Sequence, residues 1–347
     1  MSSSNRTPCV AAFGEILLRL KAPGHERLLQ SARLEAIIAG AEANVVSALS
    51  GDGIATRMIS ILPPGALGDA AVGELRRHGV ETTHIVRREG RLGIYYLEAG
   101  AGQRPSRVLY DRALSAFASA PRDIIDWRTA LDGVTWLHLS GITPALNDVT
   151  AAMTVDAART ASGLGITVSC DYNHRPSLWS NERQPPSVMR ALMPFVHIGI
   201  AGSSDCQVML GIDEPRAASG GDAERASRTV AERTLAEFRS LHMQVITCRD
   251  GDSAGQYGWS ACAMDRTSFH VSRRYQIDDV VDRVGTGDAF AAGLLYALIS
   301  GRSNADALEF AAAASCLKHT IPGDVNRVSA AEVDALLGGS GGGRIAR

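Results

Sequence analysis

Short apolar segments alternate with longer amphipathic segments along most of this chain. Five apolar segments have the length of buried strands: Thr56–Leu62, Val134–Leu139, Ile166–Cys170, Phe195–Ile200 and Gln244–Cys248. Helical spacing of apolar positions is clearest over Leu67–His78, Val149–Ser162, Asp222–Leu241, Gly287–Ile299 and Asn304–His319. Strands that alternate with helices predict βαβ units. We therefore expect an α/β fold in which helices cover both faces of a mainly parallel sheet.

Two regions lack the intervening helix pattern. These are the regions around Cys9–Leu20 and Arg91–Tyr110; in the second, Leu92, Ile94 and Tyr96 alternate with Gly93, Tyr95 and Leu97. These regions predict a small β lid beside the main sheet, built from segments near 9–20 and 83–112. One domain is expected over residues 8–337. Residues 338–347 contain a GGSGGG tract, which is typical of a flexible Gly/Ser-rich tail.

Composition and charge limit the classes of partner. The 347 residues are 45% apolar, which is enough to bury a sizeable core. Lys plus Arg number 35 and Asp plus Glu number 37, so the formal net charge is −2. A nearly neutral chain lacks the basic surface that binds nucleic acid or an anionic membrane. We expect a small-molecule partner, with no nucleic acid and no membrane.

The N-terminus and the cysteines suggest the compartment. The first residues, MSSSNRTPCV, lack the basic and apolar regions of a signal peptide. The longest uncharged apolar stretch, Ala289–Ile299, is far shorter than the ~18 residues of a membrane span. The six cysteines have no C-x-x-C spacing and are interpreted as reduced thiols. A cytoplasmic protein is expected.

The scarcity of lysine excludes several chemistries. Lysine occurs only at Lys21 and Lys318, so no G-x-x-x-x-G-K-[ST] phosphate loop is present. Neither lysine lies in an apolar strand that would desolvate an amine for Schiff-base formation, which disfavours class I aldolase and pyridoxal-phosphate chemistry. The nine histidines form no Cys/His cluster at metal-ligand spacing, so no residue is assigned to a protein-bound metal.

The segment Gly285-Thr286-Gly287-Asp288 is the strongest local motif. Its glycines open directly into a helix of small residues, where converging N–H groups and the helix dipole favour an anion. Asp288 would lie at the mouth of this anion hole, where a carboxylate can accept the proton of an attacking hydroxyl. A glycine turn followed by a capping Asp is common. The tetrapeptide alone therefore favours an ordinary turn.

Three other groups could bind a ligand. Asp171-Tyr172-Asn173-His174-Arg175 follows a predicted strand, at the edge where open α/β sheets bind ligands, and Arg175 could bind a carboxylate or phosphate. Asn44 follows the Gly40 turn in a predicted helix and could contact a sugar hydroxyl. The lid carries Tyr95, Tyr96, Tyr110 and Arg112, which could stack on a polyol. Taken singly, each group is better explained by an ordinary structural role.

Taken in order, these motifs resemble the PfkB, or ribokinase-like, carbohydrate kinases from about Val10 to Leu337. Within that family they look most like 2-keto-3-deoxygluconate kinases. The ordered set is specific, whereas no single motif is. Its members are Gly14-Glu15, Gly40-Ala41-Glu42-Ala43-Asn44, Asp171-x-Asn173-x-Arg175-x-x-Leu178-Trp179, Gly285-Thr286-Gly287-Asp288 and Lys318-His319-Thr320-Ile321-Pro322-Gly323-Asp324-Val325-Asn326.

The resemblance implies a three-layer α/β/α sandwich with a small β lid, and transfer of the γ-phosphoryl group of ATP, with Mg²⁺, to a terminal sugar hydroxyl. Asp288 would be the catalytic base, and Gly285, Thr286 and Gly287 the anion hole. The substrate would contact Gly40, Asn44, Tyr95, Tyr110, Arg112, Arg175 and Asp288. Arg175 would bind either the acid end of the substrate or the phosphates. The nucleotide would contact Gly285, Gly287, Gly251, His319 and Asn326. Mg²⁺ would be bound mainly by phosphates, and a homodimer through the lid is plausible.

The chain departs from the family pattern at three places. The usual Gly-Gly pair is Ala39-Gly40, so the turn loses conformational freedom. The Asn-x-x-Glu motif near the metal and phosphates falls at Ser203-Ser204-Asp205-Cys206, where Asp205 would have to substitute. The nucleotide-side turn, residues 249–253, carries Gly251 one position from its expected place.

Three functional hypotheses remain open from the sequence. The first is an ATP-dependent kinase that converts 2-keto-3-deoxygluconate to 2-keto-3-deoxy-6-phosphogluconate. The second is a kinase of a neutral sugar such as fructose or ribose. The third is a sugar-binding regulator with weak or no turnover, which the altered metal motif favours and the intact Asp288 disfavours.

Overall fold

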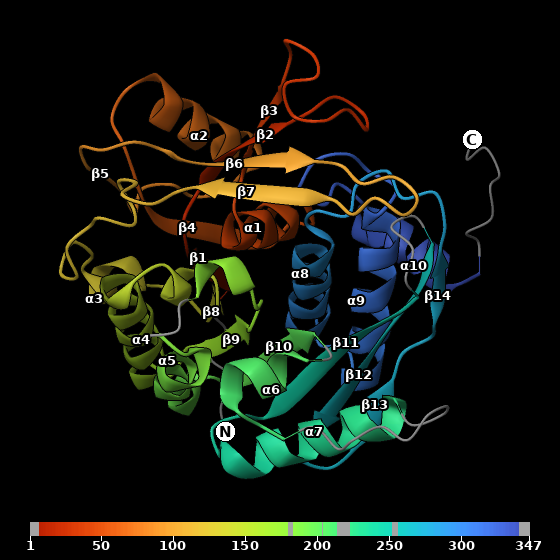
Figure 1. Cartoon of the computed structure of the whole chain (residues 1–347). Coiled ribbons are helices and arrows are strands. Elements are labelled where there is room, and N and C mark those ends of the chain that lie inside the picture. The colour runs from red at the N-terminus through yellow and green to blue at the C-terminus, as the bar shows by residue number, and fades with distance from the viewer. Residues whose placement is uncertain (1–6, 180–182, 203, 214–222, 252–255, 340–347) are drawn as a thin grey trace.

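The computed structural model describes residues 7–179, 183–202, 204–213, 223–251 and 256–339. Within these ranges, a large sheet lies between two layers of helices, and a smaller sheet covers one end of the large one (Figure 1). This arrangement confirms the expected α/β sandwich with a mainly parallel sheet and a separate small β lid.

The main sheet has the described strand order β13-β12-β11-β10-β9-β8-β1-β4-β5, and β14 also pairs with β12. The strands from β11 to β5 run parallel, whereas β12, β13 and β14 add an antiparallel edge. The bounds are β1 Cys9–Phe13, β4 Ala55–Leu62, β5 Ile85–Arg87, β8 Trp136–Ser140, β9 Thr167–Asp171, β10 Ile198–Gly202, β11 Met243–Asp250, β12 Tyr257–Asp265, β13 Phe269–Val271 and β14 Tyr275–Ile277.

Helices cover both faces of this sheet because the parallel strands are apolar on both sides. In β1, Val10 packs on one core cluster and Phe13 on another, each fully buried. One face carries α1 (Ala41–Gly51), α2 (Ala66–Arg77), α8 (Thr286–Ile299), α9 (Asn304–Lys318) and α10 (Ala330–Leu337). The other carries α3 (Trp127–Ala130), α4 (Asp148–Gly163), α5 (Pro185–Leu192), α6 (Asp205–Leu210) and α7 (Ala223–Glu237).

The lid has the described strand order β3-β2-β6-β7, with bounds β2 Leu17–Lys21, β3 Glu35–Ala39, β6 Gly93–Glu98 and β7 Arg107–Asp111. The expected lid segment near 9–20 is therefore divided between the sheets, since β1 lies in the centre of the main sheet. Likewise, β5 from the segment near 83–112 pairs with β4 of the main sheet. The unpredicted strand β3 completes the lid.

The five predicted strands correspond to β4, β8, β9, β10 and β11, and the five predicted helices to α2, α4, α7, α8 and α9. The expected first residue of α7, Asp222, and most of the predicted tail, residues 340–347, lie outside the described residues. No helix within the described ranges is long and apolar enough to span a membrane.

Candidate active site

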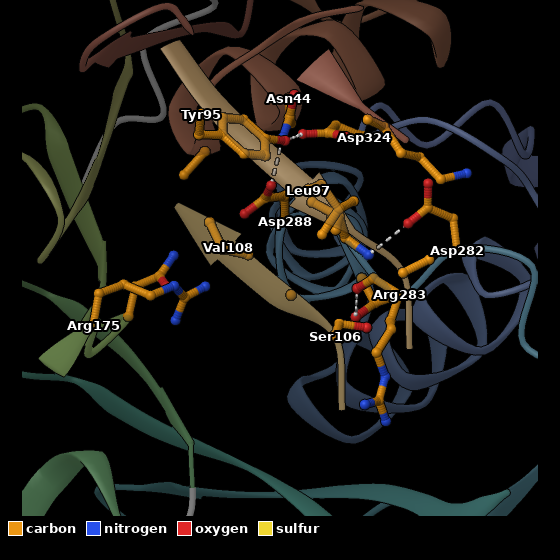
Figure 2. Close-up of a pocket in the computed structure, with 18 of the residues that line it drawn as sticks. Asn44, Tyr95, Leu97, Ser106, Val108, Arg175, Asp282, Arg283, Asp288 and Asp324 are labelled. Atoms are coloured by element: carbon orange, nitrogen blue, oxygen red, sulfur yellow. Dashed lines mark hydrogen bonds between the residues drawn. The ribbon is translucent and has the colours of Figure 1, made fainter. Parts of the chain in front are cut away.

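A cavity of about 800 Å³ lies between the lid and the carboxyl ends of the main strands. The lid, the start of α1, the loop after β9 and the start of α8 all contribute to its walls (Figure 2). Ten residues that the sequence placed in the anion hole or against the substrate line this cavity, whereas Tyr96 of the lid does not: Gly40, Asn44, Tyr95, Tyr110, Arg112, Arg175, Gly285, Thr286, Gly287 and Asp288. The topology therefore gathers residues that are far apart in the chain.

The start of α8 has the glycine turn expected of an anion hole, which is called the anion-binding turn below. Gly285 has a left-handed φ of 80° and precedes the helix. A Cβ atom at this position would lie 1.9 Å from the carbonyl oxygen of Asp324, so only glycine fits. The first helical bond runs from the N–H of Ala289 to the oxygen of Gly285. The N–H groups of the first turn before Ala289 are thus free of intrahelical bonds and can bind an anion at the positive end of the helix dipole.

Asp288 lies in the first turn of α8, where its Oδ2 accepts a hydrogen bond from Asn44 Nδ2 at 2.6 Å. Burial is the main cause that raises the pKa of Asp288 to about 7; the charges of Asp324 and Glu42 contribute in the same direction, and Asn44 and Arg175 oppose the shift. A carboxyl group with a pKa near neutrality can both accept and release a proton at physiological pH. Asp288 therefore has the position and the basicity of a general base.

This raised pKa predicts the pH dependence of turnover. Because a base must be deprotonated to accept a proton, kcat/KM for the acceptor should rise with pH through an apparent pKa near 7 and then level off. At pH 6, we expect about a tenth of the plateau value. Initial rates from pH 5.5 to 9 at saturating nucleotide measure this profile. A flat profile down to pH 5.5 would show that no group of this pKa limits the reaction.

The start of α1 supplies Asn44 and requires glycine at its cap. Gly40 has a φ of 156°, and a Cβ atom there would lie 2.6 Å from the carbonyl oxygen of Glu15. Ala39, the departure from the family's Gly-Gly pair, ends strand β3 and is not a positive-φ residue. Its methyl group therefore does not strain the turn. Asn44 is 3% exposed, and its Oδ1 has no hydrogen-bond partner among the described residues, which leaves an acceptor for a ligand hydroxyl.

The loop after β9 places charged groups on another wall of the cavity. Burial raises the pKa of Asp171 to about 8, with Asp205 and Asp288 adding to the shift. Asn173 has a left-handed φ of 42°, and its N–H donates to Asp171 Oδ1 at 3.1 Å. This bend brings Arg175 to the cavity. Arg175 is exposed, and its Nη1 donates to the carbonyl oxygen of His174 at 3.0 Å.

The lid residues expected to contact the substrate also have partners inside the protein. Arg112 is 5% exposed and forms an ion pair with Glu15, Nη2 to Oε2 at 2.6 Å. The hydroxyl group of Tyr95 donates to Asp324. Tyr110 is half-buried, with its ring centre 6.2 Å from that of Tyr95. The aromatic rings form a wall, whereas the charge of Arg112 is already neutralised.

A buried ionic network joins the lid to the anion-binding turn. Arg19, on lid strand β2, is fully buried and pairs with Asp282 at 2.7 Å and with Asp324. Asp282 precedes the turn, and the backbone of Asp324 packs against Gly285. Lys318 is also fully buried, and its Nζ donates to the carbonyl oxygen of Ile321 at 3.0 Å. The network therefore holds three separate segments in one arrangement.

The expected nucleotide contacts outside the turn do not line the cavity. His319 is 2% exposed and contacts Tyr257, and burial lowers its pKa to about 4. Asn326 accepts the N–H of Val328 at 3.2 Å, and Gly251 is exposed after β11. Gly251 lies beside residues 252–255, which are outside the described residues, as is Ser203 of the altered Asn-x-x-Glu segment. Asp205 does line the cavity and accepts the N–H of Gly202 at 2.9 Å.

Several polar groups of the site were not assigned from the sequence. Glu42 is 1% exposed, accepts hydrogen bonds from Ser140 and Thr143 at 2.6 and 3.0 Å, and has a pKa raised by burial. The sequence signal that could have indicated Glu42 as a site residue is its position within the Gly40–Asn44 segment. The other unassigned groups are Glu15, Arg19, Asp171, Asn173, Asp282, Arg283 and Asp324. The ion pairs of Glu15 and Arg19 join residues that are distant in sequence, so no local pattern indicates them.

Comparison with known proteins identifies the family of the chain. The sequence profile of the pfkB family carbohydrate kinases matches residues 8–330. The chain belongs to this family. This carbohydrate kinase is 33% identical to the 2-dehydro-3-deoxygalactonokinase of Haloferax volcanii over 334 residues, which cover 96% of this chain and 98% of the relative.

Solved structures confirm the fold of the kinase. The crystal structure of 2-dehydro-3-deoxygluconokinase from Thermotoga maritima matches with a TM-score of 0.90 and 43% identity, covering 95% of this chain and 99% of that one. A putative ribokinase II from E. coli, solved with ATP and Mg²⁺, matches with a TM-score of 0.74 and 16% identity over 95% of this chain and 99% of that one. The second likeness extends to the fold alone.

Proposed function

We propose that this kinase phosphorylates the terminal hydroxyl group of 2-keto-3-deoxygluconate, also called 2-dehydro-3-deoxygluconate, with ATP as phosphoryl donor. One observation carries the proposal: Asp288 lies beside the free N–H groups of α8, in a cavity that also contains the cation of Arg175. A base, an anion hole and a carboxylate-binding group are the three parts that such a reaction needs. Similarity to a 2-dehydro-3-deoxygluconokinase at 43% identity supports this substrate class.

In the proposed reaction, the terminal oxygen of the sugar acid attacks the γ-phosphorus of ATP while the bond to ADP breaks. Asp288 accepts the hydroxyl proton, and Asn44 holds the carboxylate in place through the 2.6 Å hydrogen bond. The N–H groups at the start of α8 stabilise the negative charge of the transferring group. Phosphoryl transfer depends mainly on such positioning and charge stabilisation, so the absence of a phosphate-loop lysine is no obstacle.

The cation that recognises the acid end of the substrate is Arg175 in this proposal. Arg112 already pairs with Glu15 in a buried contact, so its charge is not available without leaving a carboxylate unpaired. Arg175 instead donates to a neutral carbonyl oxygen and is exposed beside the cavity. A guanidinium group can exchange such a contact for a bidentate pair with a carboxylate.

The site also fits Mg²⁺ that enters with the nucleotide. Magnesium usually keeps several waters and binds one or two carboxylates together with substrate phosphates. Asp171 and Asp205 line the cavity, and the charge of Asp205 raises the pKa of Asp171, so these carboxylates lie near each other. Among the residues that the structure describes, no cluster of three or more His, Cys, Asp or Glu side chains could hold a metal ion. Bound Mg²⁺ would neutralise charge on the phosphates.

Replacing Arg175 with Gln tests the recognition of the acid. We expect kcat/KM for 2-keto-3-deoxygluconate to fall by roughly 10- to 100-fold, as expected for loss of a charge-assisted pair. A slow reaction with fructose should change by less than about threefold because fructose has no carboxylate. Initial rates with both sugars measure the two ratios.

The control for this test is Arg88→Gln. Arg88 also donates to a neighbouring carbonyl oxygen, that of Glu89 at 3.3 Å, but it does not line the cavity. It should therefore leave both rates near those of the unsubstituted protein. Equal losses on both sugars in Arg175→Gln would contradict recognition of the acid by Arg175 and would leave this residue a role toward the phosphates.

A further inference from the structure

Arg283 is a second cation of the cavity, and its hydrogen-bonding capacity is largely unused. Its Nε and Nη2 atoms are buried and have no hydrogen-bond partner among the described residues. The guanidinium carbon lies 5.0 Å from the ring centre of Tyr257. Stacking on a ring satisfies the face of a guanidinium group but not its N–H groups. Buried N–H groups without partners cost free energy, so this arrangement indicates a missing acceptor.

A neighbouring cation makes an anionic acceptor the best match. The guanidinium carbon of Arg249 lies 3.9 Å from the centre of the same Tyr257 ring. Burial lowers the pKa of Arg249, and the charge of Arg283 lowers it further. Two positive groups therefore share one aromatic ring, and a bound anion would relieve their repulsion.

The position of Arg283 indicates which anion this is. Arg283 lines the cavity two residues before Gly285, so it is covalently joined to the anion-binding turn. Figure 2 shows its side chain extending away from Asp288 and from the lid residue Tyr95, whereas Arg175 lies across the cavity. Groups that bind the sugar and the reacting phosphoryl group surround Asp288. Arg283 therefore faces the side of the cavity that remains for the part of the nucleotide that is not transferred.

Neither of the two lysines of the chain supplies a cation on the side of the cavity where Arg283 lies. Lys318 is fully buried and donates to the carbonyl oxygen of Ile321, and Lys21 pairs with Glu35 at 3.5 Å on the lid. The cationic groups at the cavity are thus Arg112, which Glu15 neutralises, Arg175, Arg283 and Lys21 with its lid partner, together with His25 when protonated. Arg283 is the one among them with buried N–H groups that lack acceptors.

We propose that Arg283 binds the phosphates of the nucleotide that remain in ADP, through the planar fork of its guanidinium group. The inference rests on the proposed function, because it assumes that the nucleotide occupies the cavity beside the sugar acid. It assigns the non-reacting phosphates to Arg283 and the carboxylate of the substrate to Arg175. Planar bidentate recognition of phosphate is a characteristic use of arginine, and lysine does not reproduce it.

The test compares nucleotides that differ in their phosphates. Binding of ADP, AMP and adenosine to the full chain is measured by calorimetry without sugar, for the unsubstituted protein, Arg283→Gln and Arg283→Lys. We expect Arg283→Gln to weaken ADP by at least about tenfold, as for the loss of a charged hydrogen bond. Adenosine, which has no phosphate, should change by less than about twofold. Arg283→Lys should recover part of the ADP affinity because it keeps the charge but not the fork.

Arg302→Gln is the matched control, because Arg302 also stacks on an aromatic ring, at 4.5 Å from the centre of Phe310, but lies outside the cavity. It should leave ADP binding unchanged. Unchanged ADP affinity in a folded Arg283→Gln protein, or equal losses for ADP and adenosine, would overturn the proposal, as would failure of the unsubstituted protein to bind ADP. If ADP binding depends on Arg283 but no sugar acid is phosphorylated, the inference stands and the substrate assignment fails.

Discussion

Asp288→Asn should lower kcat by about 10²- to 10⁴-fold, the usual contribution of a general base, while the sugar acid still binds. Asparagine keeps the shape of the side chain and can accept the hydrogen bond that Asn44 now gives to Asp288 at 2.6 Å. It cannot accept the hydroxyl proton of the substrate. Single-turnover rates and equilibrium binding of the sugar acid, measured on the same preparation, separate the two effects.

The stability of the Asp288→Asn protein shows whether its lower turnover could come from misfolding. The pKa of Asp288 is raised from 3.8 to about 7, so the folded state holds more protons than the unfolded state between these values. Stability contributed by this group is therefore lost as the pH rises through that window. At pH 8, Asp288→Asn should unfold at no lower urea concentration than the unsubstituted protein. With that result, low turnover of Asp288→Asn cannot be attributed to misfolding.

The matched control for this prediction is Asp278→Asn, which removes an exposed carboxylate outside the cavity. It should leave kcat unchanged within about twofold, as expected of a surface site. Turnover by Asp288→Asn at the rate of this control would contradict the role of Asp288 as base. Loss of sugar binding together with turnover would instead assign Asp288 to substrate binding.

Arg19→Met should destabilise the fold by about 3–5 kcal/mol, the usual cost of leaving a buried charge without its partner. Arg19 is fully buried between Asp282 and Asp324, and its removal leaves two carboxylates that are 6% and 3% exposed. Methionine fills much of the volume but supplies no charge. Urea unfolding at pH 7.5 measures the loss.

Two comparisons separate the loss of charge from the loss of packing. Arg19→Lys keeps a positive charge but cannot reach both carboxylates as a fork does, so it should lie between the two extremes. Arg302→Met removes a more exposed pair, that with Asp334 at 2.7 Å, and should cost no more than about 1 kcal/mol. Equal stability of Arg19→Met and the unsubstituted protein would show that the network does not hold the lid to the turn.

Periodicity predicts five of the ten described strands of the main sheet, namely β4, β8, β9, β10 and β11, because short apolar segments there alternate with helical segments. The pattern predicts β1 in the lid region because the segment CVAAF is followed closely by Leu17–Lys21, and both have strand-like patterns. What distinguishes them is burial: β1 is covered on both faces, whereas β2 carries half-buried residues. That difference depends on α1 and on Trp127 of α3 packing against β1, which a local pattern does not contain.

The residues of the site show the same difference between local patterns, which the sequence contains, and contacts between distant segments, which it does not. The motifs predict Gly285, Asp288 and Asn44 as site residues, and all three line the cavity, because glycine geometry and helix starts are local properties. Pairings between distant residues were not predictable: Asn44 and Asp288 are 244 positions apart, and Tyr95 and Asp324 are 229 apart. Arg112 is an example: it lines the cavity as expected, but its ion pair with Glu15, 97 positions away, was not predictable.

The measurement that tests the central claim most directly is ADP release with Mg²⁺ and ATP. The panel contains 2-keto-3-deoxygluconate, its galacto epimer, fructose, ribose and a sample without sugar. The account predicts turnover of the keto acids with kcat/KM at least about 100-fold above that of the neutral sugars, the ratio expected when a site contains a charged group for the carboxylate. Turnover of fructose or ribose alone, or sugar binding without any ADP release, would contradict it.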